Sequence, residues 1–114
     1  MGILYYETQS GRAPVEEFIS ELPLESRYEV LTLLRRLELG EYLGMPHSRS
    51  LASMASGLHE LRLRDSHGHI RIFYYTRLKG KIYLVHALRK KSQTISEQDK
   101  RLILSRLRTV ERIC

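Results

Sequence analysis

The stretch of sequence that decides the fold is GLHELRLRDSHGHIRIFYYTRLKGKIYLVHALRKK, residues 57–91. Apolar and polar residues alternate in two parts of it, residues 58–64 and 70–75, as in strands with one buried face. A third part, residues 82–88, is apolar on both faces, as in a central strand. The turn-forming sequences DSHG and KG separate the three parts. The pattern predicts a three-stranded antiparallel meander.

A strand and two helices are predicted before the meander. The β-favouring run Ile3–Tyr6 is followed at Pro14 by a helical spacing of apolar residues that ends at Leu22. A second, wider apolar stripe follows and ends at Gly40, the predicted C-cap. The two helices predict an antiparallel helical hairpin. Residues 41–57 have no sustained period, and we expect a loop there.

A last helix is predicted after the meander. Ser96, with Asp99 three residues later, resembles a capping box that opens it. Apolar residues then recur at helical spacing, namely Ile103, Leu107, Val110 and Cys114. The sequence as a whole predicts one compact α+β domain over residues 1–114, with an N-terminal strand, a helical hairpin, the meander and a C-terminal helix.

The composition favours a cytoplasmic protein without a cofactor. No apolar run approaches the ~20 residues of a transmembrane helix, and no secretory signal pattern is present. The single cysteine, Cys114, has no partner for a disulfide within the chain. The sequence has no Gly-rich phosphate loop, and the pair His67 and His69 lacks a third metal ligand nearby.

The charge is divided between the two halves of the chain. Residues 1–57 carry five Arg and eight Glu, a net charge of −3, whereas residues 58–114 carry fourteen basic and five acidic residues, a net charge of +9. A basic region of this density is typical of a protein that binds phosphate or an acidic partner.

The meander concentrates this positive charge. If its Leu and Ile side packs on the hairpin, then Arg62, Arg64 and Arg71 leave from the opposite face, together with Phe73 and Tyr75. Guanidinium groups and aromatic rings on an open sheet face suit single-stranded RNA, because they bind phosphates and stack on bases. The alternative is that the aromatic residues belong to the core, which must hold for part of them. Tyr74 shares its parity with Ile70 and Ile72 and is predicted to point inward.

Three short motifs carry a resemblance to a known family. GLHELR at residues 57–62, IRIFY at 70–74 and LRKKSQT at 88–94 are followed by Ser96 at the start of a helix. This order of motifs resembles the HigB/RelE superfamily of toxins. Within that superfamily it resembles the phage-derived Gp49-like branch, in which ELR, R-x-x-Y and KK-x-x-T follow one another in the same order. The resemblance covers nearly the whole chain and implies a RelE/ParE-like fold.

The resemblance also implies a function. Such proteins are toxins of type II toxin–antitoxin systems that cut translated mRNA on the ribosome without a metal ion, through attack of the 2′-hydroxyl group. Their partners are mRNA, the ribosome and a HigA-like antitoxin with a helix-turn-helix fold. The resemblance implies no membrane partner. The motifs imply phosphate contact and transition-state stabilisation by four residues, Arg62, Arg71, Lys90 and Lys91.

The group that transfers protons is less evident from the sequence. Relatives often have a Tyr or His near the end of the chain, but residues 92–114 contain neither. His86 shares its parity with Ile82 and Leu84, so we expect a hydrogen-bonded core residue there. We therefore count His69 among the catalytic candidates, because a neutral imidazole suits proton transfer. The remaining candidates for RNA binding are His59, Arg64, His67, Phe73, Tyr75 and Arg89.

Two other functions stay open at this point. The same fold serves ParE-like toxins, which inhibit a topoisomerase by contact and need no catalytic residues. A remnant that binds its antitoxin and has no activity is the third reading. Fold alone does not decide among them.

Overall fold

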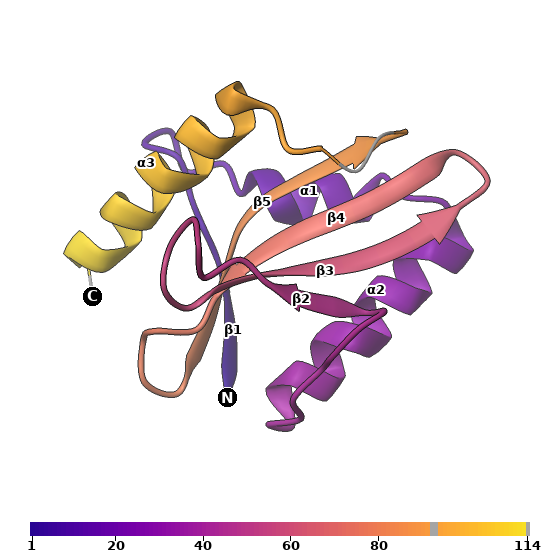
Figure 1. Cartoon of the computed structure of the whole chain (residues 1–114), viewed down its shortest axis with the longest axis horizontal. Helices are drawn as coiled ribbons and strands as arrows, with labels where there is room; N and C mark the ends of the chain where they lie inside the picture. The colour runs from indigo at the N-terminus through magenta and orange to yellow at the C-terminus, as the bar shows by residue number, and fades with distance from the viewer. Residues whose placement is uncertain (92–93, 114) are drawn as a thin grey trace.

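The computed structural model describes residues 1–91 and 94–113, and its centre is a single mixed sheet (Figure 1). The strand order is β1-β5-β4-β3-β2, with β1 parallel to β5 and every other neighbouring pair antiparallel. The five strands are β1 (Gly2–Tyr5), β2 (Ser48–Ser50), β3 (Leu58–Asp65), β4 (Gly68–Tyr75) and β5 (Lys81–Lys90).

The predicted α+β class is confirmed, and the sheet is larger than the sequence indicates. The N-terminal strand joins the sheet directly, beside β5. Part of residues 41–57, expected to be a loop, forms β2, in which Ser48 pairs with Leu61. The buried Ser48 hydroxyl group also hydrogen-bonds to the Tyr74 hydroxyl group at 2.6 Å. Three residues are too few to show a period, so the pattern of the sequence does not reveal this edge strand.

Helices α1 (Pro14–Ser20) and α2 (Leu24–Glu38) cover what we call the first face of the sheet. Pro14 stands in the first turn of α1, where its missing N–H is no loss. Gly40 follows the end of α2 with φ +87°, the left-handed conformation that ends many helices, and its N–H donates to the Leu37 carbonyl group. The core of this face joins helix residues to Leu61, Ile70, Ile72, Tyr74, Ile82 and Leu84.

Helix α3 (Glu97–Ile113) packs on the opposite, second face. Its buried residues are Ile103, Leu107 and Val110, as their spacing predicts. The cap is also confirmed: the Asp99 N–H donates to the Ser96 hydroxyl oxygen, which in turn donates to the Asp99 carboxylate. The second core consists of these side chains and residues of the sheet and the β2–β3 segment, among them Leu51, Leu58, Phe73, Tyr75, Val85 and Leu88.

Helix α3 crosses one end of the second face, whereas β3 and β4 extend beyond it toward the turn that joins them (Figure 1). Gly68 in this turn has φ +124°, and a Cβ there would approach the Lys90 carbonyl oxygen to 3.1 Å. The glycine therefore allows the end of β5 to lie close to the turn. In the described ranges, no helix is both long and apolar enough to cross a membrane.

Candidate functional site

The uncovered end of the second face carries rows of charged residues that run across the strands. Arg62 on β3 stands opposite Arg71 on β4, in one row. In the next row, His69 on β4 stands between Arg64 on β3 and Lys90 on β5. Directly opposite residues on neighbouring strands have their Cβ atoms about 5 Å apart. The antiparallel pairing therefore gathers these five side chains, which are far apart in the sequence.

A buried carboxylate, Glu60, lies beside these rows. Arg71 Nε donates to Glu60 Oε2 at 2.7 Å, and Arg71 Nη2 lies 2.6 Å from the same oxygen. Arg49 Nη2 lies 3.0 Å from Glu60 Oε1, and Arg62 Nε lies 3.7 Å from the same oxygen. Among the described residues, one carboxylate therefore faces three guanidinium groups, so that these four side chains together carry more positive than negative charge. We call Glu60 together with the basic residues around it, namely Arg49, Arg62, Arg64, Arg71 and Lys90, and with the neighbouring His69, the cationic site.

Three residues expected on an open face are in fact buried. Arg71 is 2% exposed, Phe73 is fully buried and Tyr75 is 5% exposed. The prediction of an open aromatic and arginine surface was therefore wrong for these residues. For Phe73 and Tyr75 the physical reason is α3, which packs on both rings, and the Tyr75 hydroxyl group donates to Glu111. Arg71 is buried in its ion pair with Glu60.

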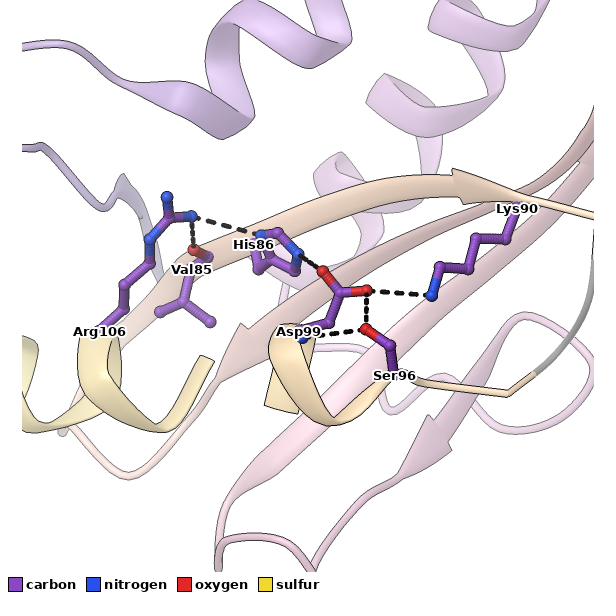
Figure 2. Close-up of polar contacts among 6 residues, drawn as sticks. All are labelled: Val85, His86, Lys90, Ser96, Asp99 and Arg106. Carbon is purple, nitrogen blue, oxygen red and sulfur yellow. Dashed lines mark hydrogen bonds and ion pairs between the residues drawn. The ribbon is translucent and has the colours of Figure 1, made fainter. Parts of the chain in front are cut away.

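The start of α3 adds a second polar network at the edge of the cationic site (Figure 2). Asp99 Oδ2 lies 3.1 Å from Lys90 Nζ, and Asp99 Oδ1 lies 3.0 Å from His86 Nε2. On the other side of the imidazole, Arg106 lies 3.4 Å from His86 Nδ1 and donates to the Val85 carbonyl group at 2.8 Å. Both nitrogens of His86 thus have polar neighbours.

The protonation of this network follows from burial and hydrogen bonding. Burial lowers the pKa of His86, although the hydrogen bond to Asp99 acts in the opposite direction. Burial alone would raise the pKa of Asp99, but hydrogen bonds from Ser96, Lys90 and His86 outweigh it and lower the pKa of this carboxyl group. At neutral pH we therefore expect a neutral imidazole beside a carboxylate.

His86 also corrects the parity argument from the sequence. The pairing of β4 with β5 shifts register between Phe73 and Tyr74, which pair with His86 and Leu84 respectively. The irregularity turns His86 to the second face, away from Ile82 and Leu84, where it stacks on Phe73 with ring centroids 5.8 Å apart. The residue is hydrogen-bonded, as expected, but on the opposite side of the sheet.

Two hollows flank the cationic site near the β3–β4 turn. The first, of about 370 Å³, is bordered by Met45, His47, Arg62 and Arg64. The second, of about 470 Å³, is bordered by residues of the turn and by Lys91. Both are also lined by His69. Arg64, His67 and Lys91 are exposed around these hollows.

Two predicted RNA-binding residues lie on the first face instead. Arg89 donates to both carboxylate oxygens of Asp65, which also accepts a hydrogen bond from Ser26 of α2. His59 stacks on Tyr74 with ring centroids 5.2 Å apart, and burial lowers its pKa. The structure thus does not bring these two residues together with the cationic site. The motif residues Ser92 and Gln93, and the predicted helix residue Cys114, lie outside the described residues.

Sequence reasoning missed Arg49, Glu60, His86 and Asp99 as parts of the site. Arg49 lies in the segment expected to be a loop. The best signal in the sequence was Glu60, the acidic residue of the ELR motif. It lies on the same face of its strand as Leu58 and Arg62. A carboxylate on a face otherwise rich in arginine indicates an ion-pair centre.

Comparison with known proteins places the chain in a family. The model of the family described as phage derived protein Gp49-like (DUF891) matches residues 17–108, which include β2 to β5 and most of α3. No curated protein matches the chain. The chain therefore belongs to the phage-derived Gp49-like family, a RelE/HigB-like toxin family.

Proposed function

We propose that this chain is the toxin of a type II toxin–antitoxin system and that it cleaves translated mRNA on the ribosome. Membership of the Gp49-like family supports the toxin assignment. The observation that carries the ribonuclease proposal is the surplus charge of the cationic site, where three guanidinium groups surround the single carboxylate of Glu60. A fixed excess of positive charge favours a phosphate whose negative charge grows during the reaction.

The proposed reaction is an internal transfer at one phosphate of the RNA. The 2′-oxygen forms a bond to phosphorus as the bond from phosphorus to the 5′-oxygen breaks, which leaves a 2′,3′-cyclic phosphate and a 5′-hydroxyl group. One proton must leave the 2′-hydroxyl group and one must reach the 5′-oxygen. The protein therefore needs cations around the phosphate and at least one group that transfers protons.

Arg62 and Lys90 are the proposed phosphate contacts. Their side chains are 17% and 29% exposed, so an anion can reach them, and they come from the two strands on either side of β4. Arg71 is buried and acts in this proposal through Glu60, by holding the carboxylate in place. Exposed Arg64, His67 and Lys91 would bind the RNA strand on either side of the scissile phosphate.

His69 is the proposed proton-transfer group. It is half-buried, stands between Arg64 and Lys90, and borders both hollows. His86 is less suited to this role because Asp99 and Arg106 occupy the surroundings of its two nitrogens.

The proposed antitoxin surface is the outer side of α2. Leu24 and Tyr28 are more than 70% exposed, and Leu31 is 47% exposed, on one stripe of the helix. Contiguous exposed apolar side chains mark protein interfaces. The half of the chain that includes α2 has a net charge of −3, which complements a helix-turn-helix protein whose DNA-binding surface is basic. Tyr28→Glu should therefore abolish neutralisation by the helix-turn-helix antitoxin and leave toxicity intact.

The experiment that tests the activity is primer extension on a translated message with purified ribosomes. Lys90→Gln should lower cleavage by about 10²-fold, the scale of losing one fixed donor. Lys81→Gln is the matched control, since Lys81 is exposed at the other end of β5. Intact message during growth arrest would refute the ribonuclease proposal, and arrest with signs of DNA damage would favour the ParE-like activity.

A further inference from the structure

We propose that Asp99 is a positioning residue of the cationic site, which holds the ammonium group of Lys90 at the point where the substrate phosphate binds. The inference rests on the proposed ribonuclease function and adds to it a residue outside the three family motifs. Lys90 ends β5, and its flexible side chain alone would sample many positions, because a lysine carries about 2 kcal/mol of rotamer entropy. An ammonium group that stabilises a transition state must instead be fixed before the reaction.

Asp99 is itself held from several directions. The Ser96 hydroxyl group donates to Asp99 Oδ2 at 2.8 Å, and His86 Nε2 lies 3.0 Å from Oδ1. His86 in turn is stacked on the fully buried ring of Phe73. Figure 2 shows that these contacts form a chain from Arg106 through His86 and Asp99 to Lys90. The position of the Lys90 ammonium group is therefore tied to the core beneath α3.

The ion pair leaves Lys90 available to a phosphate. Its side chain keeps 29% exposure, and it stands in the same row as His69. The Asp99 carboxylate offsets one positive charge, and Arg62 and Arg49 lie beside Glu60 on the same face. We infer that the pairing with Asp99 weakens the electrostatic attraction of this surface for RNA and fixes the position of the Lys90 ammonium group.

A purely structural role for Asp99 is the competing explanation, because an acidic residue in the first turn stabilises a helix. Two variants separate the roles. Asp99→Asn keeps the size of the side chain, removes its charge and leaves one acceptor oxygen in place of two. Glu97→Gln removes the other first-turn carboxylate of α3, which is exposed and pairs with Lys100, and leaves the contacts of Asp99 with Lys90, His86 and Ser96 in place.

The first measurement is steady-state RNA cleavage, with kcat and KM determined separately. Asp99→Asn should lower kcat about 10-fold or more with little change in KM, because misplacement of one group impairs the reaction and the other cations still bind RNA. Glu97→Gln should lower the melting temperature slightly, because it removes a first-turn carboxylate from α3, and should keep kcat close to the wild-type value. Equal losses of kcat in the two variants, or an unchanged kcat in Asp99→Asn, would overturn the proposal.

The second measurement needs no enzymatic activity. An amine-acylating reagent, followed by mass spectrometry, gives the labelling rate of Lys90 relative to exposed Lys81 in the same molecule. Asp99→Asn should raise this ratio several-fold, and Glu97→Gln should leave it unchanged. If the wild-type protein does not cleave RNA, the proposed function fails while this ratio still decides whether Asp99 holds Lys90. An unchanged ratio in Asp99→Asn contradicts the proposal.

Discussion

Two carboxylates lie on opposite faces of the same sheet and have different surroundings. Asp65, on the first face, pairs with the single guanidinium group of Arg89 and accepts a hydrogen bond from Ser26 on α2. Glu60, on the second face, is completely buried beside the guanidinium groups of Arg49, Arg62 and Arg71. The first cluster is electrically balanced, whereas the second has more positive than negative charge.

The difference indicates different roles for the two faces. A balanced pair with a hydrogen bond to a helix fastens α2 to the sheet and needs nothing more. An unbalanced cluster at an uncovered sheet edge keeps a charge that an external anion can neutralise. Family membership alone does not make this distinction, because both carboxylates lie within the matched residues 17–108.

The largest expected effect is the loss of the Glu60 pairing. Arg71→Ala should destabilise the protein by about 3–5 kcal/mol, because it removes one partner of a buried ion pair. Arg71→Lys should also destabilise it, since an ammonium group cannot reproduce the two contacts of the guanidinium group. Urea unfolding measures both changes.

The control for this prediction is Arg64→Ala, which removes an exposed cation in the neighbouring row and should change stability by about 0.5 kcal/mol or less. Arg71→Met combined with Glu60→Leu should recover most of the stability, because both partners then become apolar. A stable Arg71→Ala protein would mean that the buried pair does not hold the second face together.

Asp65→Asn should have the next largest effect, about 1.5–3 kcal/mol, because it weakens charge-assisted hydrogen bonds from Arg89. Its pH dependence is also defined. The hydrogen bond from Arg89 holds the pKa of Asp65 well below its usual range, so its stabilisation is present above about pH 4 and is lost as the pH falls further. Urea unfolding at pH 7 and pH 3 should therefore show a smaller stability difference for Asp65→Asn than for the wild type.

A third prediction contrasts the two faces in RNA binding. Arg62→Gln should reduce the slope of log affinity against log salt by about 0.7, the value for one phosphate contact on a single strand. Arg36→Gln, on α2 and paired with Glu41, should leave the slope unchanged. Filter binding of a single-stranded RNA across a salt series measures both. Equal slopes for all three proteins would remove the cationic site as the RNA-binding surface.

The sequence predicts the first face well and the second face incompletely. Alternation places Leu61, Ile70 and Ile72 together on the face that packs on α1 and α2, because strand periodicity determines which residues share a face. It could not show that α3 buries Phe73 and Tyr75, because that depends on where a distant helix packs. His86 points to the second face because the pairing of β4 with β5 shifts register, and this shift has no clear sequence signature.

The smallest expected effect concerns the pH dependence that His86 contributes. Burial lowers its pKa in the folded protein, so the unfolded chain binds a proton more readily. Stability should therefore decrease as the pH falls below about 6.5, the ordinary value for histidine. His86→Gln should flatten this part of the stability curve, and Asp99→Asn should steepen it, because the hydrogen bond that His86 donates to Asp99 raises the pKa of the imidazole. The double variant should follow His86→Gln, since no imidazole remains for Asp99 to influence. Urea unfolding between pH 7 and pH 5 measures the three curves. If the Asp99→Asn curve runs parallel to the wild-type curve, the contact between Asp99 and His86 does not change the pKa of the imidazole.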